Sequence, residues 1–137
     1  MLMIDSPPTK DHFSFFSVIS TRWRDLDSHK HINHASYLTY LETSRLEYLN
    51  KIFDTENDFI MASMEINYHK QLKHPQELEI GQKVVHVGNK SLKILGGIFK
   101  YGEEDLVFSS LATLVSFNYE KQKTCLLPDV EKIFLDQ

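Results

Sequence analysis

The chain has 137 residues, of which 42% are apolar and 12% aromatic, and its formal net charge is -4. This length and composition predict one folded domain spanning residues 1–137, with enough apolar side chains for a core, and they exclude a disordered chain. The net negative charge disfavours a nucleic-acid partner. The only cysteine is Cys125, which excludes an internal disulfide and any multi-cysteine zinc site. We expect Cys125 to pack as a small hydrophobic residue.

The first eleven residues predict a loose leader. They contain Asp5 and the Pro7-Pro8 pair where a signal peptide would carry an apolar run. No later window reaches the roughly 20 consecutive apolar residues of a membrane span. We therefore expect a soluble cytoplasmic protein with no membrane partner.

A strand, a loop and a helix are predicted next. Apolar side chains recur at even spacing over residues 13–23, which is the period of a strand with one buried face. Residues 24–33 are polar and follow neither period, so they predict a loop rich in Asp and His. Helical spacing then runs from His34 to Ile52, and Asn33 is a suitable N-cap.

The rest of the chain predicts strand after strand. Alternating segments cover residues 59–69, 77–87, 91–101 and 106–119, and turn residues at 88–90 and 102–105 join the last three. Gly81, Gly96 and Gly97 indicate bulges or close packing. A short helix is predicted over residues 129–136, after Pro128.

These elements predict the α+β class, with an antiparallel sheet of about five strands curled around one long helix. One helix cannot cover both faces of such a sheet, and the edge strands expose unpaired backbone groups. We therefore expect a homodimer joined edge to edge, or a homotetramer built from two such dimers.

The polar loop holds the residues that carry chemistry. Two carboxylates, Asp25 and Asp27, and three imidazoles, His29, His31 and His34, come directly before the helix N-terminus. Unpaired N–H groups at such a terminus can stabilise an oxyanion. A carboxylate beside them supplies a base or nucleophile, which is sufficient for acyl transfer or ester hydrolysis. A capping loop with solvated Asp and His side chains explains the same residues.

The run from Asp25 to Tyr37, DLDSHKHINHASY, resembles a family signature. That signature is approximately Asp-x-Asp-x-x-Gly-His-Val-Asn-Asn-Ala-x-Tyr, followed by a helical Arg, which corresponds to Arg45 here. It belongs to the hotdog-fold acyl-CoA thioesterases, in the 4-hydroxybenzoyl-CoA thioesterase-like and YbgC-like branch. The order of helix, strand and hairpin in the rest of the chain is also similar. The resemblance implies the hotdog fold, dimers with sites at their interface and no cofactor beyond the coenzyme A of the substrate.

The resemblance also implies roles for individual residues. Asp27 falls on the catalytic carboxylate, and the backbone N–H of His34 on the group that polarises the carbonyl. His31 and Asn33 fall on the signature His and the first Asn after it. Lys30 replaces the signature Gly, which would strain a positive φ there. His34 replaces the second Asn but keeps the backbone donor.

The predicted reaction is hydrolysis of an acyl-CoA thioester to the free acid and coenzyme A. Asp27 either attacks the carbonyl directly or orients water, and both routes fit the residues. The acyl chain is expected in an apolar slot beside the helix, lined by Tyr37, Leu38 and Leu41. Contacts to the phosphates of coenzyme A are expected from a hairpin that carries Lys90, Ser91 and Lys93.

Other readings of these residues stay open. His29, His31, His34 and Asp25 are suitable metal ligands, although we predict no metal. A non-catalytic acyl-CoA-binding module and a hydratase-like lyase acting on enoyl-thioesters are the alternative functions, and an acyl-carrier-protein thioester is an alternative substrate. Glu65 is a second carboxylate that could face the site, and Glu42 and Arg45 are expected to be structural.

Overall fold

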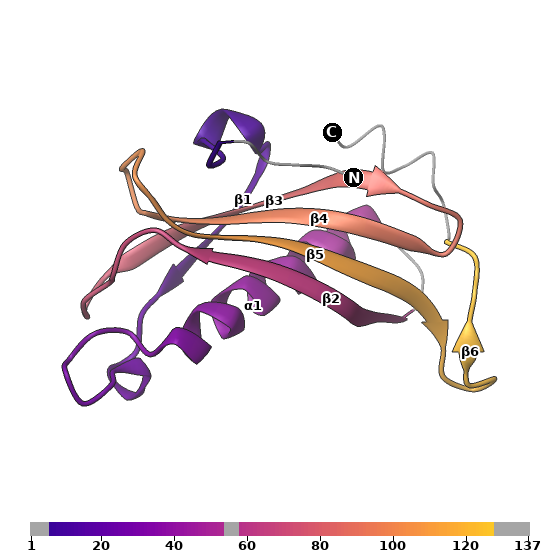
Figure 1. Cartoon of the computed structure of the whole chain (residues 1–137), viewed down its shortest axis with the longest axis horizontal. Coiled ribbons are helices and arrows are strands. Elements are labelled where there is room, and N and C mark those ends of the chain that lie inside the picture. The colour runs from indigo at the N-terminus through magenta and orange to yellow at the C-terminus, as the bar shows by residue number, and fades with distance from the viewer. Residues whose placement is uncertain (1–5, 54–57, 128–137) are drawn as a thin grey trace.

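The computed structural model describes residues 6–53 and 58–127. It contains one antiparallel sheet and one long helix (Figure 1). The strands follow the order β1-β3-β4-β5-β2, and β6 pairs with β5 beside this path. The helix predicted over residues 129–136 lies outside the described residues. The elements are η1 (Lys10–His12), β1 (Phe15–Ser20), η2 (Trp23–Asp25), α1 (His34–Ile52), β2 (Asp58–Tyr68), β3 (Glu77–Val87), β4 (Ser91–Lys100), β5 (Leu106–Asn118) and β6 (Lys123–Thr124).

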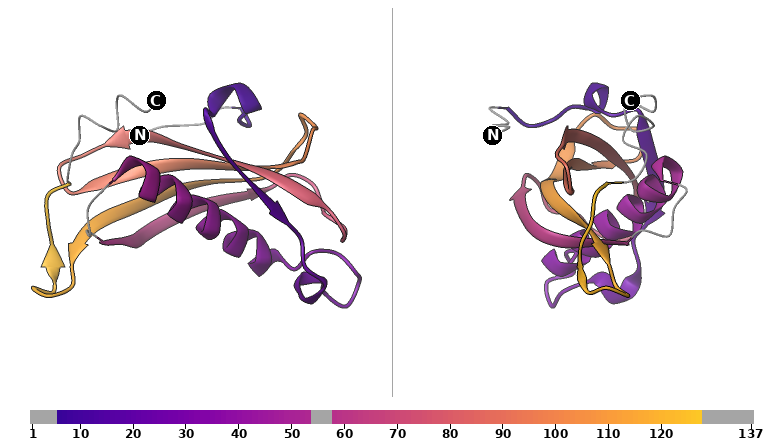
Figure 2. Two further views of the ribbon diagram at one scale, coloured as in Figure 1. Left: turned by 180° about the vertical axis from the view of Figure 1, so that it is seen from behind. Right: turned by 90° about the vertical axis from the view of Figure 1, so that its right-hand side faces the viewer.

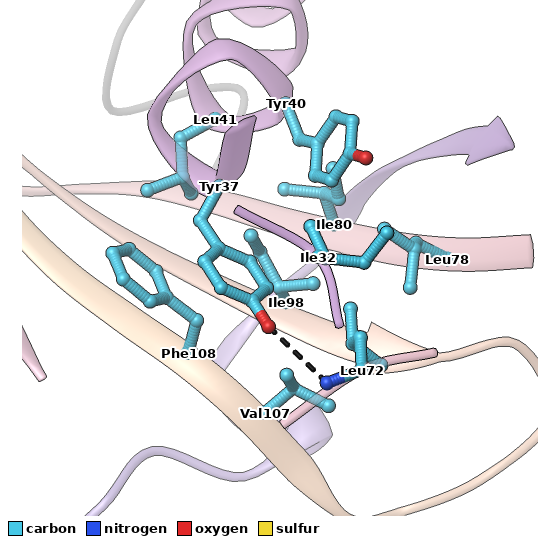
Figure 3. Close-up of a cluster of buried hydrophobic side chains, with 10 residues drawn as sticks. All are labelled: Ile32, Tyr37, Tyr40, Leu41, Leu72, Leu78, Ile80, Ile98, Val107 and Phe108. Carbon is cyan, nitrogen blue, oxygen red and sulfur yellow. Dashed lines mark hydrogen bonds between the residues drawn. The ribbon is translucent and has the colours of Figure 1, made fainter. Parts of the chain in front are cut away.

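The sheet curls around α1, so the helix lies on its concave face (Figure 2). The helix begins and ends where the sequence predicts, because Asn33 caps it and its apolar residues recur at helical spacing. Tyr37, Tyr40 and Leu41 of α1 pack against buried side chains of β3, β4 and β5 (Figure 3). The predicted α+β class and the hotdog arrangement are confirmed.

The predicted glycine contacts are confirmed on both faces of the sheet. Gly81 on β3 pairs with Gly97 on β4; a Cβ on Gly81 would collide with the ring of Phe13, and a Cβ on Gly97 would make an unusually tight contact with it. A Cβ on Gly96 would lie about as close to the side chain of Leu41 on α1, at 3.0 Å, as to that of Ser110 on β5, at 2.9 Å. The β3–β4 register shifts between Val84 and His86, and the β4–β5 register shifts between Ile98 and Phe99, so these glycines permit close packing and are not themselves at the irregular positions.

Phe13 reaches the outer face of the sheet because the preceding residues are ordered. Lys10 and Asp11, expected in a loose leader, lie in η1, and Lys10 forms an ion pair with Glu79 at 3.1 Å. The first strand is shorter than predicted, since η2 forms over residues predicted as strand and loop. Trp23 continues the apolar period but is 79% exposed.

The strands β1 and β2 are the two edges of the sheet. All residues of β2 are exposed or only half buried, and the exposed ones include the large side chains of Met61 and Tyr68. Such an edge is open to pairing with another strand. In the part of the chain that the structure describes, no helix is both long and apolar enough to cross a membrane.

Candidate active site

The loop between β1 and α1 folds into a tight turn that presents Asp27. The backbone N–H of Asp27 donates to the His31 carbonyl at 2.8 Å, and the N–H of Lys30 donates to the Asp27 carbonyl at 3.1 Å. Lys30 has a φ of +64°, so a lysine occupies the left-handed conformation that favours glycine. The backbone of the turn therefore keeps a positive φ at the position of the signature Gly.

The Asp27 carboxylate is exposed, and one of its two oxygens accepts hydrogen bonds. Its Oδ1 accepts hydrogen bonds from the backbone N–H groups of His29 at 2.8 Å and His31 at 3.1 Å. These two bonds hold the pKa of Asp27 below its usual value, so the group is ionised at neutral pH. Its Oδ2 accepts no hydrogen bond from any described residue, which leaves one carboxylate oxygen open for chemistry.

Asp25, two residues earlier, is buried and fully engaged. Its carboxylate accepts hydrogen bonds from the backbone and guanidinium of Arg22 and from the hydroxyl of Tyr40. Burial raises the pKa of Asp25, but the bonds from Arg22 and Tyr40 outweigh it and keep the pKa below its usual value. Asp25 therefore holds η2 against α1 and has no oxygen facing open space.

The N-terminus of α1 lies beside this loop. Asn33 caps the helix through its side-chain oxygen, which accepts from the N–H of Ala35 at 2.9 Å, as predicted. The backbone N–H of Asn33 donates to the Asp25 carbonyl at 2.7 Å and fixes the approach of the chain. Among the described residues the N–H of His34 has no acceptor. It is a free donor at the positive end of the helix dipole.

A cavity of about 480 Å³ joins these groups. Its wall combines the loop, the first turn of α1 and the segment that follows β2. The sequence alone predicts no role for this last segment. It reaches the site because β2 pairs with β5. This pairing places the ring of Tyr68 against the ring of Tyr37, with the ring centroids 6.1 Å apart. The lining residues are Asp27, His31, Ile32, His34, Tyr37, Tyr68, His69, Lys70 and Gln71.

The three residues predicted for the acyl slot have different surroundings. Tyr37 forms a fixed wall of the cavity: its ring stacks on Phe108 at 5.1 Å, and its hydroxyl accepts from the N–H of Leu72 at 3.2 Å (Figure 3). Leu38 is exposed on α1, and Leu41 is fully buried in the core. Within one chain, only Tyr37 of the three lines the cavity.

The predicted phosphate-binding hairpin lies at the other end of the sheet. Ser91 pairs with Val115, whereas Tyr68 beside the cavity pairs with Phe108. Lys90 and Lys93 flank Ser91, so the single chain does not bring these three residues to Asp27. They stay a prediction.

The other candidate groups also lie apart from the cavity. Glu65 pairs with Leu111 on β5 and does not line the cavity. In the described residues no group of three His, Cys, Asp or Glu side chains is placed to hold a metal ion. Cys125 is partly buried, with its Sγ at 3.2 Å from the Ser116 hydroxyl.

A sheet curled around one helix, with a carboxylate loop at the helix N-terminus, defines a hotdog-fold protein of the thioesterase type. Residues 21–135 match the model of the thioesterase-like superfamily, and the chain belongs to this family. It is 30% identical over 127 residues to the uncharacterized protein YsmA of Bacillus subtilis, which covers 90% of this chain and 86% of that protein.

Solved structures show the same fold. A thioesterase from Thermus thermophilus complexed with coenzyme A and Zn superposes with a TM-score of 0.79 and 28% identity, covering 88% of this chain and 98% of that one. The PA5185 protein of Pseudomonas aeruginosa superposes with a TM-score of 0.84 and 23% identity, covering 94% and 92%.

Proposed function

We propose that this protein hydrolyses an acyl-CoA thioester to the free acid and coenzyme A, with Asp27 as the catalytic carboxylate. One observation carries the proposal: Asp27, an ionised carboxylate with one oxygen free of hydrogen bonds from the described residues, lines the same cavity as His34, whose backbone N–H has no acceptor among them. Membership of the thioesterase-like superfamily and the coenzyme A bound to the Thermus thermophilus thioesterase support it.

The cavity suits the charge changes of the reaction. The thioester carbonyl oxygen would accept the His34 N–H, which stabilises negative charge as the carbonyl carbon becomes tetrahedral. Asp27 Oδ2 either attacks this carbon and forms an anhydride that water opens, or takes a proton from the attacking water. In both routes the C–S bond breaks, the thiolate of coenzyme A leaves and is protonated, and the oxygen of water ends in the acid.

A homodimer would complete the site. If two β2 edges pair about a two-fold axis, they run antiparallel, and the Tyr68 end of one lies beside the Asp58 end of its partner. The hairpin with Lys90, Ser91 and Lys93 lies toward the Asp58 end within each chain. The partner's hairpin is then on the same side of the joined sheet as Asp27, where it can contact the phosphates of coenzyme A. Residues 37 and 38 of α1 line the path of the acyl chain in this arrangement.

The test is coenzyme A release from a panel of acyl-CoAs, measured with a thiol reagent, while enoyl absorbance is followed in parallel. Thiol release with at least one acyl-CoA is the expected result. Loss of enoyl absorbance without thiol release would identify a lyase instead. Tight binding with neither signal would identify a binding module, and both of these results contradict the proposal. The same panel presented on an acyl-carrier protein identifies the carrier.

A further inference from the structure

Arg45, near the middle of α1, is a buried cation that the described residues leave without a hydrogen-bond or ion-pair partner. Its side chain is only 7% exposed, yet within the described part of the chain it forms no hydrogen bond or ion pair. The guanidinium of Arg22, by contrast, is half exposed and bonded to Asp25. Arg45 lines a groove of about 340 Å³ between α1 and the edge strand β2.

The burial of Arg45 calls for a permanent acceptor. Burial lowers the pKa of its guanidinium, and the negative charge of Glu42 acts in the opposite direction. Charged groups are almost never fully buried unless they are paired, because the lost hydration must be replaced. A substrate is bound only during turnover and leaves the resting protein with the same unpaired cation. A protein partner replaces the hydration at all times.

The groove also offers a carboxylate and apolar side chains to such a partner. Glu42 is exposed three residues before Arg45 but forms no ion pair with it, although both line the groove. Leu46 is 53% exposed and Met61 on β2 is 40% exposed, and both lie in the same groove, with Asp58 at its end. A surface with an unpaired cation, an unpaired carboxylate and apolar residues between them is complementary to itself under a two-fold rotation.

The centre of β2 fixes where such an axis would cross α1. Tyr37 contacts Tyr68 at one end of the strand, with ring centroids 6.1 Å apart, and Phe53 contacts Phe59 near the other end, at 5.2 Å. Arg45 is midway between Tyr37 and Phe53 along the helix. A two-fold axis through the middle of β2 therefore passes close to Arg45, where each helix meets the same stretch of its copy.

We propose that a second copy of this chain occupies the groove, with the Glu42 carboxylate of each protomer bonded to the Arg45 guanidinium of its partner. The inference rests on the dimer of the proposed function and specifies its contacts. The axis then runs between residues 42 and 45, which pairs opposite charges twice and keeps the two Arg45 side chains from facing each other. Leu46 and Met61 become buried around the two ion pairs.

The dissociation constant of the dimer tests this pairing, measured by analytical ultracentrifugation over a dilution series. Glu42→Arg changes an exposed side chain, so the fold is retained, and it should raise the dissociation constant at least about tenfold because two cations meet. Arg45→Glu should do the same. Combining Glu42→Arg with Arg45→Glu restores opposite charges and should return the constant to within about threefold of the wild type. Lys121→Glu, an exposed charge reversal on the β5–β6 turn, is the matched control and should change nothing.

Unchanged dimerisation of Glu42→Arg, or a double variant no better than the single ones, would overturn the pairing. The variant Arg45→Met distinguishes the pairing of Arg45 with the partner's Glu42 from a role of Arg45 in substrate binding. It should weaken the dimer, whereas an unchanged dimer with a raised KM confined to acyl-CoAs bearing a terminal carboxylate would assign Arg45 to the substrate and also overturn the inference. If the wild-type protein is a monomer at micromolar concentration, the proposed dimer is wrong as well. Thiol release by that monomer would still support the hydrolase.

Discussion

Asp25 and Asp27 are two residues apart in one loop, yet their carboxylates have different surroundings. Asp25 is 3% exposed and accepts hydrogen bonds from Arg22 and Tyr40. Asp27 is exposed and lines the cavity; one of its oxygens accepts from two backbone N–H groups, and the other accepts no hydrogen bond from any described residue. Both have a pKa below the usual value, so ionisation does not distinguish them. The free oxygen does, and it supports the proposed catalytic role of Asp27, whereas the fully bonded carboxylate of Asp25 fits a structural role.

The largest expected effect separates the two residues by turnover. Asp27→Asn retains a side-chain oxygen for the His29 and His31 N–H groups, so the turn should persist, but it removes the negative charge. We expect kcat to fall at least ~100-fold with little change in acyl-CoA binding, because the charge acts in the transition state. Steady-state kinetics and a melting temperature measure both properties. Turnover close to that of the wild type would contradict the assignment and make Asp25 and Glu65 the next carboxylates to test.

Asp25→Asn should give the opposite pattern. It leaves the buried hydroxyl of Tyr40 and the backbone of Arg22 with a weaker acceptor, which should lower the free energy of unfolding by about 1–3 kcal/mol. Turnover per folded molecule should fall much less than in Asp27→Asn. Denaturant unfolding checks the stability, and kinetics at a temperature where the variant is folded check the turnover. A stable but inactive variant would show that Asp25 takes part in chemistry.

The cap of α1 tests the donor beside Asp27. Asn33→Ala should cost about 0.5–2 kcal/mol of stability and lower kcat, since it removes the acceptor for Ala35 and loosens the first turn. His34→Ala keeps the backbone N–H and should be milder in turnover. The pair is compared by kinetics and thermal unfolding. Loss of turnover in a well-folded His34→Ala variant would assign the chemistry to its imidazole.

The smallest expected effect concerns Lys30. Its left-handed backbone is strained for a residue with a Cβ, so Lys30→Gly should raise the free energy of unfolding by up to about 1 kcal/mol and leave kcat unchanged. Chemical denaturation provides the measurement. A destabilised variant would mean that the lysine side chain contributes contacts that exceed the strain.

The pH dependence of stability and of turnover follows from the lowered pKa values of Asp25 and Asp27. A carboxylate whose pKa is depressed in the folded state adds stability above its unfolded value of about 3.9, and the gain is lost as pH falls through the folded value. Asp25 should therefore stabilise the fold fully at pH 5–7 and progressively less below pH 4. In the enzyme without substrate, Asp27 also stays ionised in this range because its pKa is lowered. The plot of kcat/KM against pH should therefore show no fall due to protonation of a carboxylate above pH 5. A limb with a midpoint between pH 5 and 6 that is absent from Asp25→Asn would contradict this.

Local patterns predicted most of the fold. Helical spacing and the Asn33 cap defined α1, and alternation with turn residues defined β3, β4 and β5. The first strand was predicted too long because the apolar period continues through Trp23. The chain leaves that period at η2, where the carboxylate of Asp25 binds the backbone of Arg22. The same carboxylate also accepts from the hydroxyl of Tyr40 on α1, a tertiary contact that periodicity does not report.

The candidate site was predicted only where it is local in sequence. Asp27, His31 and His34 lie close together in sequence, in the loop and at the first position of α1, so one motif identifies them together. The wall after β2 was missed, because Tyr68 meets Tyr37 only through the pairing of β2 with β5. Arg45 is expected to be structural from the sequence, and the groove that it lines forms only where α1 and β2 come together in the fold. Neither the contact between Tyr68 and Tyr37 nor the groove at Arg45 produces a short-range pattern in the sequence.

The most direct test of the account is a crystal structure of the Asp27→Asn variant with an intact acyl-CoA. The variant should bind the thioester without cleaving it. We predict that the thioester carbonyl oxygen accepts the His34 N–H and that its carbonyl carbon lies in van der Waals contact with the side chain at position 27. A thioester bound elsewhere, or a carbonyl oxygen directed away from the start of α1, would contradict the account.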